Sequence, residues 1–457
     1  MTNRLDLTTG AIPGQLFRMA APILFGMLIF SLYMLTDLYF VSRLGPDAVA
    51  ALSISGNIFF VHLGLSFIIG TGAMSLIAQS FGARQIDRAA KVFQQSLMLS
   101  LFTGGIAAIC GVLVARPYIR FFGGQGDAFI WGVEYFQIYS VSLLVLLLLH
   151  VFGSCYRGMG DSKTSMKIMF QSLVLNIILD PVLIFGLAGF PVMGVKGAAL
   201  ASLISQVYGL IIYIYLIFFK KQHIHLNGPW KIDLAIVKKS LYIGLPSGLA
   251  YFLLTANLLI TYRVVSQYGT PALAAIGIGY RITQVTYLPS VAIADAMAAM
   301  IGQNLGAKRY DRIIETFWTG WKISSLFMLG GTLVCWIFSA FLIHLFSKDA
   351  QVAHFGIIYL KIVSLSNLIV GTILTVSAMF QGIGKTYPTL VCAVADNFLF
   401  AAAVLTLPIL MGWGISSVWW IKLTAGALEM IFSSIWLLYT IKKISRISME
   451  PGPTLDD

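Results

Sequence analysis

Charge is scarce in this sequence. Only 11% of its 457 residues are Asp, Glu, Lys or Arg, and 58% are hydrophobic, whereas soluble domains carry about 25% charged residues. A chain with so little charge cannot cover a surface that faces water, which excludes a soluble globular protein. The composition therefore predicts an integral membrane protein.

Cysteine is also rare and follows no pattern. The four cysteines are Cys110, Cys155, Cys335 and Cys392, all in or beside apolar runs and without paired spacing. This argues against a zinc site or a disulfide framework. No hydrolase or nucleotide-binding motif is present, so we expect neither an enzyme nor a bound cofactor. The first 25 residues lack a cleavable signal pattern, and the first apolar run is expected to remain as a membrane helix.

Long apolar runs are what the sequence has in abundance. A membrane helix needs about 20 such residues, and twelve runs of this length can be counted. They fall near 15–40, 50–79, 92–115, 129–154, 166–187, 194–219, 239–265, 271–303, 313–346, 352–380, 387–411 and 414–441. The predicted fold is an all-α integral membrane protein with twelve transmembrane helices.

Lysine and arginine are distributed unevenly among the connecting segments. With the amino terminus placed in the cytoplasm, the inner connections hold 20 cationic residues and the outer ones hold 6. Because basic loops stay on the cytoplasmic side, this count places both termini there. The same asymmetry, together with anionic lipid, accounts for the net charge of +12 and gives no reason to expect a nucleic-acid partner.

The two halves of the sequence match each other at an offset of 224 residues. In this register, residues 22–88 share 19 identities with residues 246–312 over 67 positions without a gap. The loop motif "FGARQIDR" meets "LGAKRYDR", and further on "RGMGDSKT" meets "QGIGKTYP". This indicates two pseudo-symmetric six-helix lobes that enter the membrane from the same side, because six is even.

The predicted organisation follows from this repeat. The lobes are residues 1–219 and 240–457, the latter ending in a cytoplasmic tail, and residues 220–239 form a cytoplasmic linker between them. His223 and His225 in this linker are interpreted as solvated loop residues rather than as a pair of metal ligands.

Five acidic residues fall inside predicted helices: Asp37, Asp180, Asp295, Asp396 and Glu429. An ionisable side chain in hydrocarbon is costly unless it is paired or hydrated, so each acid is a functional candidate. At the 224-residue offset Asp37 aligns with Thr261 and Asp180 with Val404, so the second half keeps neither carboxylate. We predict that Asp37 and Asp180 couple an ion to transport. The alternative is a hydrogen-bonded aspartate at a helix kink.

Polar groups surround these two aspartates. Tyr33 and Asp37 share a helix face at i,i+4, as do Asn176 and Asp180. Pro181 cannot donate a hydrogen bond to the preceding turn, which leaves a carbonyl oxygen free beside the carboxylate. The Asn176 amide, the Asp180 carboxylate and this carbonyl lie within one turn and predict a hydrophilic pocket, which would hold either a proton relay with water or a small cation through oxygen ligands.

For the acidic residues of the second half, the sequence allows only less specific predictions. Asp295 is expected either to pair with Arg281 or to line a cavity. Asp396 and Asn397 are the expected counterpart of the Asn176 region, and Glu429 is interpreted as structural.

At this point the residues resemble a known family, the multidrug and toxic compound extrusion (MATE) transporters, and in particular its prokaryotic, DinF-like branch with an aspartate in helix one. The resemblance lies in "NIILDPVLIFGLAGFPVMGVKGAALAS" (176–202), in "AAPILFGMLIFSLYMLTDLYFVSRLGPDAVAALS" (20–53), in the double "QSFGA" and "QNLGA", and in "RGMGDSKT". It implies a two-lobed antiporter that exports cationic or lipophilic compounds in exchange for H+ or Na+ by alternating access.

The resemblance also implies roles for individual residues. The ion-coupling set is Asp37, Asn176, Asp180 and Tyr139, with Tyr135 as the alternative tyrosine. If the ion is Na+, Asp37, Asn176 and Asp180 are its expected ligands. The residues expected to line a substrate cavity are Tyr33, Tyr135, Ser202, Arg281, Asp295, Asp396 and Asn397, and those expected to let helices bend are Pro22 and Pro181. The sodium-linked branch has an acid in helix seven where this chain has only Asn257 and Arg263, which favours the pocket of the first lobe.

The expected partners are small cationic or amphipathic drugs and membrane lipids. We expect a monomer in the cell (inner or plasma) membrane. One alternative is a lipid-intermediate flippase of the same superfamily, which more often has additional helices and a cationic cavity. A receptor or scaffold that transports nothing would not need paired carboxylates inside the membrane.

Overall fold

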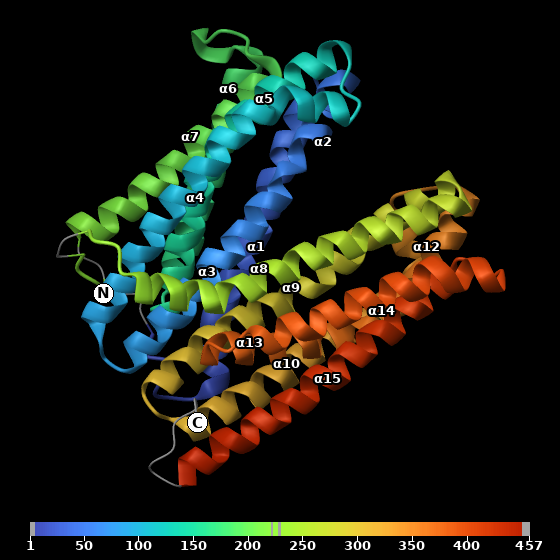
Figure 1. The fold of residues 1–457 in the computed structure, drawn as a ribbon. Coiled ribbons are helices and arrows are strands. Elements are labelled where there is room, and N and C mark those ends of the chain that lie inside the picture. The colour runs from blue at the N-terminus through green and yellow to red at the C-terminus, as the bar shows by residue number, and fades with distance from the viewer. Residues whose placement is uncertain (1–4, 221–222, 227–229, 450–457) are drawn as a thin grey trace. The chain divides into compact units, whose positions relative to one another are not determined.

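The computed structural model describes residues 5–220, 223–226 and 230–449, and within them the chain is helical without a strand. The helices are α1 (Ile12–Ser42), α2 (Pro46–Gly56), α3 (Ile58–Gly82), α4 (Ile86–Phe121), α5 (Gly126–Gly158), α6 (Ser162–Phe185), α7 (Gly194–Ile214), α8 (Leu234–Val265), α9 (Thr270–Gly306), α10 (Tyr310–Ile337), α11 (Ser339–His344), α12 (Ala350–Val363), α13 (Ser366–Ile383), α14 (Tyr387–Met411) and α15 (Ser416–Met449) (Figure 1).

Twelve helical segments of the described chain are long and apolar enough to cross a membrane, as predicted. Three of the expected spans are not single helices. The second consists of α2 and α3, which meet at Asn57, the run at 313–346 is divided into α10 and α11 at Phe338, and the run at 352–380 is divided into α12 and α13 around Ser364. Thr332 of α10 donates a 2.8 Å hydrogen bond to the Ser364 carbonyl. A backbone oxygen at the break is thus satisfied by a neighbouring helix, as an apolar environment requires.

The internal repeat is visible in the element boundaries. The α2–α3 segment covers residues 46–82 and α9 covers 270–306, while α4 begins at 86 and α10 at 310. The loop between these helices contains a non-glycine residue in the left-handed region in both halves, Arg84 with φ 58° and Lys308 with φ 56°. Side chains rarely adopt this conformation, so its recurrence at the offset of 224 confirms the duplicated unit.

Contacts within the chain divide it into two compact units. Unit 1 comprises residues 1–6 and 21–248, and unit 2 comprises residues 7–20 and 249–457. The predicted lobe boundaries follow the linker. The contacts instead assign the start of α1 to unit 2 and the first half of α8 to unit 1. Each exchanged segment ends beside a proline inside its helix, Pro22 in α1 and Pro246 in α8.

In unit 1, α5 is the central helix and packs against α2, α3, α4 and α7 (Figure 1). One apolar cluster of this unit surrounds Phe93, Phe152 and Tyr156, and a second contains Val41, Tyr139 and Ile184. The second cluster encloses the polar residues described below. In unit 2, α9 packs against α10, α12 and α13, and α14 packs against α15.

Side chains of unit 1 bind the linker at two places. Gln95 of α4 donates to the Lys231 carbonyl at 2.8 Å and accepts from the Asp233 N–H at 2.9 Å, and a loop carboxylate binds His223. His223 Nε2 lies 2.8 Å from Asp161 Oδ2, and their side chains are 1% and 0% exposed. The interpretation of His223 as solvated is therefore wrong, because a buried carboxylate in the α5–α6 loop binds its ring. His225 is exposed. Burial raises the pKa of Asp161, but hydrogen bonds from His223 and Thr164 outweigh it and leave the pKa below the ordinary value of 3.8.

Candidate ion-coupling site

Three helices of unit 1 bring a closed polar group together. Asn176 Nδ2 donates to Asp37 Oδ1 at 3.3 Å and to Asp180 Oδ1 at 3.2 Å, so one amide bridges the two carboxylates. Ser202 Oγ donates to Asp37 Oδ2 at 2.9 Å, and the Tyr33 hydroxyl donates to the Ser202 carbonyl at 3.0 Å. The sequence predicted the first three residues as one pocket, and the structure joins them.

The helices explain this arrangement. Asp37 and Tyr33 lie one turn apart on α1, Asn176 and Asp180 one turn apart on α6, and Ser202 projects from α7. Side chains at i and i+4 share a helix face, so α1 and α6 each contribute a pair. Pro181 lies inside α6 without ending it, and its missing N–H leaves the carbonyl four residues earlier without that donor.

The site is buried and incompletely satisfied. Asn176 and Asp180 are fully buried and Asp37 is 4% exposed. Asp180 Oδ2 and Asn176 Oδ1 have no hydrogen-bond partner. Within the described residues no Lys or Arg forms an ion pair with either aspartate. In an apolar surrounding, two charged carboxylates that share one amide and lack a counter-ion raise the free energy of the site, and neutralising one of them lowers it.

The two candidate tyrosines lie beside this group on α5. Tyr135 and Tyr139 are buried, and their rings stack with centroids 6.0 Å apart. Both interact electrostatically with Asp37, but in the described part of the chain neither hydroxyl donates to an aspartate. Their position is consistent with the predicted set, and a coupling role for Tyr139 stays a prediction.

The residues predicted in the second half do not form one site. Asp295 and Arg281 both lie in α9, and fourteen residues of helix separate them by about 21 Å along the axis. Pairing of these two side chains is therefore excluded. Asp396 instead lies 3.7 Å from Lys422 of α15, and Asn397 donates to the carbonyl of Ala393 in its own helix.

Sequence reasoning missed two polar residues. Lys422 lies within the apolar run of the last helix, and a charge count over that run would have found it. Gln206, one turn beyond Ser202 on α7, is 7% exposed and its Oε1 has no partner. Its polarity inside "ASLISQVYGL" is the signal that would have identified it.

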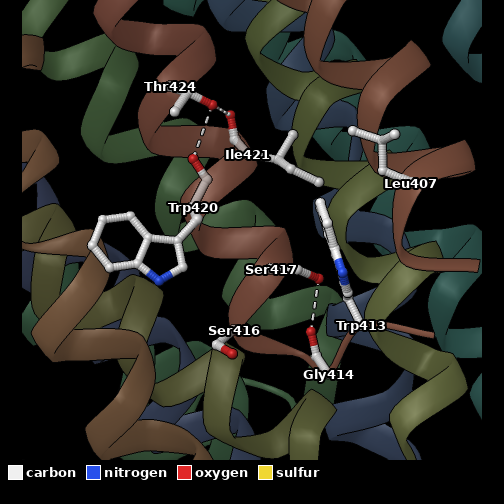
Figure 2. A pocket seen from close by; sticks show the side chains of 8 residues that line it. All are labelled: Leu407, Trp413, Gly414, Ser416, Ser417, Trp420, Ile421 and Thr424. Carbon is white, nitrogen blue, oxygen red and sulfur yellow. Dashed lines mark hydrogen bonds between the residues drawn. The ribbon is translucent and has the colours of Figure 1, made fainter. Parts of the chain in front are cut away.

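Two cavities lie apart from this site. One of about 530 Å³ is formed by the end of α14 and the start of α15, and Figure 2 shows Trp413 and Trp420 at its sides. Two of its hydroxyls donate to backbone carbonyls, Ser417 to that of Gly414 and Thr424 to those of Trp420 and Ile421 (Figure 2). The second cavity, about 360 Å³, has a mainly apolar lining from α6 and α7 and does not include the aspartates.

Comparisons with known proteins point to one family. The MatE family model matches residues 22–182 and 246–407, so its two matches begin at the offset of the internal repeat. The probable multidrug resistance protein YoeA of Bacillus subtilis (strain 168) is 27% identical over 378 residues, which cover 81% of this chain and 81% of that protein. The probable multidrug resistance protein NorM of Thermotoga maritima is 25% identical over 377 residues, 82% of this chain and 81% of its own.

A solved structure agrees with these sequence relatives. The crystal structure of MATE in the bent conformation matches with a TM-score of 0.91 at 25% sequence identity, covering 97% of this chain and 99% of that chain.

Proposed function

The chain belongs to the MatE family, which consists of membrane transporters and not of enzymes, and we propose that it is a secondary active antiporter that exports cationic or lipophilic compounds in exchange for protons by alternating access. The two relatives described above are named probable multidrug resistance proteins, which supports small drug-like molecules as the substrate class. The protein is a multi-pass membrane protein, and we place it in the cell (inner or plasma) membrane as a monomer with both termini in the cytoplasm.

One observation supports the coupling role most directly: a single buried amide links two carboxylates that have no counter-ion. A proton bound at this pair neutralises one of the two charges. It also changes which oxygens accept from Asn176 and Ser202, because a protonated oxygen donates instead. Protonation therefore changes the hydrogen bonds between α1, α6 and α7. An ion gradient can therefore shift the equilibrium between two packing arrangements of these helices.

The donor geometry favours a proton over Na+. Na+ would need several oxygen ligands directed at one point, whereas Asn176 directs its Nδ2 group at both carboxylates. A proton needs only one carboxylate oxygen, and Asp180 Oδ2 has no partner. Na+ would require the Asn176 amide to turn its oxygen toward the aspartates.

The test is drug export in proteoliposomes under proton and sodium gradients imposed separately. We expect the proton gradient to drive export and the sodium gradient alone to fail. Asp37→Asn and Asp180→Asn keep the shape but cannot lose a proton, so both should abolish proton-driven export. Asp47→Asn changes an exposed aspartate at the start of α2 and should leave export intact.

The two possible failures are distinct. Export driven by sodium alone and lost in Asp37→Asn would keep the site but replace the ion. Normal gradient-driven export by a well-expressed Asp37→Asn protein would overturn the coupling assignment.

A further inference from the structure

A second group of charged side chains lies between α14 and α15 of unit 2, where Asp396 is buried, Glu429 is half-buried and the Lys422 side chain is 35% exposed. Asp396 is 5% exposed, and its Oδ2 lies 3.7 Å from Lys422 Nζ. The same ammonium group lies 4.9 Å from the centroid of the Phe400 ring, one turn further along α14. The other carboxylate oxygen, Asp396 Oδ1, is buried and has no hydrogen-bond partner.

Glu429 completes this group. It lies two turns after Lys422 on the same face of α15 and interacts electrostatically with both Asp396 and Lys422. No hydrogen bond or ion pair to the Glu429 carboxylate occurs among the described residues. Two carboxylates thus share one lysine, whose ammonium group is paired with Asp396. A carboxylate left without a partner in an apolar surrounding is neutralised by taking up a proton.

In the described chain, few other titratable side chains lie near Glu429. The Cys392 thiol, one turn before Asp396, faces Glu429. The α13 helix contains no acidic or basic residue. On α10 and α12, which also pack against α15, Asp311, Glu315, Lys322, His354 and Lys361 are exposed. The Arg312 guanidinium donates hydrogen bonds to Asn304 Oδ1 and to the Gly10 carbonyl. The ring of Tyr359 packs on Trp419.

The group is not a copy of the site in unit 1. At the offset of 224, Asp396, Lys422 and Glu429 correspond to Ser172, Ala198 and Ser205. The α14–α15 pair is the counterpart of α6–α7, so both units carry charge between the same two helices of the repeat. The positions differ, because Asp396 corresponds to a residue two turns away from Asp180. Each unit therefore carries its own set of acids.

We propose that Glu429, on the same face of α15 as the lysine of the Asp396–Lys422 ion pair, is a second proton-binding residue of the transporter. This rests on the proposed proton-coupled function and adds to it that each transport cycle moves one proton through unit 2 besides that of unit 1. The step is simple: the Glu429 carboxylate takes up one H+ and becomes a carboxylic acid, while Lys422 remains the counter-ion of Asp396.

Infrared difference spectroscopy between acid and alkaline pH tests proton binding without transport. A buried carboxylic acid gives a carbonyl band that disappears on deprotonation. We expect Glu429→Gln to lose one component of this band and Asp37→Asn to lose a different one. Glu315→Gln, an exposed glutamate of α10, is the control. A Glu429→Gln spectrum identical to that of Glu315→Gln overturns the proposal. Lys422→Met removes the shared cation and should enlarge the carboxylic-acid signal at a fixed pH; no change in that signal overturns it as well.

Stoichiometry then tests the link to transport. The membrane potential at which drug flux reverses, measured at a fixed pH gradient, reports the number of protons exchanged per drug molecule. We expect Glu429→Gln to lower this number by one while export continues. An unchanged number overturns the second coupling site even where the infrared band is lost. Failure of the proposed function is recognisable separately, because the wild-type protein would then show no proton-driven flux.

Discussion

Ser202 offers a quantitative test of the coupling site, because it contacts Asp37 through a single hydrogen bond. Its hydroxyl donates to Asp37 Oδ2 at 2.9 Å, and the remaining described donor to this carboxylate, Asn176 Nδ2, is longer at 3.3 Å. In Ser202→Ala the carboxylate loses its shorter bond. The substitution removes one oxygen and adds no bulk, so the packing of α7 should persist.

The magnitude follows from the difference between two states of Asp37. A hydrogen bond to a charged group contributes about 1.5–3 kcal/mol, and one to a neutral group about 0.5–1.5 kcal/mol. Removing the donor therefore destabilises the charged form by roughly 1–1.5 kcal/mol more than the protonated form. About 1.4 kcal/mol corresponds to a factor of ten in an equilibrium constant, so the site should hold its proton roughly tenfold more tightly.

The direction of this change in proton affinity can be measured from the pH dependence of drug export in proteoliposomes. Because the proton is retained to higher pH, the profile of Ser202→Ala should move toward alkaline pH by about one unit. Ser205→Ala is the matched control: Ser205 is equally buried, lies on the same helix and donates to the Ala201 carbonyl instead of to Asp37. The reasoning fails if both variants shift alike, if neither shifts, or if Ser202→Ala shifts toward acid pH.

Two further predictions concern the α5–α6 loop and the linker, which we place in the cytoplasm. Asp161→Ala removes the α6 cap and the His223 bond and should lower stability by about 2–4 kcal/mol at neutral pH, measured by unfolding in detergent. Asp349→Ala removes only the cap of α12 and should lower the free energy of unfolding by about 1 kcal/mol. Equal losses of stability in the Asp161 and Asp349 variants would count against a contribution from the His223 bond. Because hydrogen bonds keep the pKa of Asp161 below 3.8 despite burial, its contribution is present above that pH and is lost as pH falls through the lowered pKa, so wild type and variant should converge in acid. A cysteine at the exposed position His225, in a Cys110→Ser background, should react with impermeant reagents from the cytoplasmic side alone; labelling from outside would refute the topology.

The sequence allowed the helices and the unit 1 site to be predicted because both depend on short-range patterns. A membrane span is a continuous apolar run, and the twelve runs are long enough to be counted without knowing what packs against them. Tyr33 with Asp37, and Asn176 with Asp180, are pairs one turn apart in one helix, so a shared face follows from helix geometry. That α1 and α6 bring these faces together was an inference from the chemistry and from the family resemblance.

Features that depend on which faces meet could not be predicted. The break between α12 and α13 lies in "KIVSLSNLIVG", which contains no proline and no glycine near Ser364, and it coincides with the hydrogen bond from Thr332 of another helix. The Asp396–Lys422 pair requires the register between two helices. The burial of His223 requires that the linker fold back onto Asp161, which the polar composition of the linker does not suggest.

The repeat shows which properties the two halves keep and which they do not. Arg84 and Lys308 share a left-handed backbone, as do Gly160 and Gly384, with φ 87° and 75°. A loop that reverses the chain between two packed helices restricts the backbone in the same way in both copies, so these conformations persist. Buried charge behaves differently, because an acid in an apolar surrounding costs free energy wherever it has no role. Each half can lose a carboxylate that it does not need without affecting the other half. The charges that remain, in different places in the two units, therefore identify where each unit has its own chemistry.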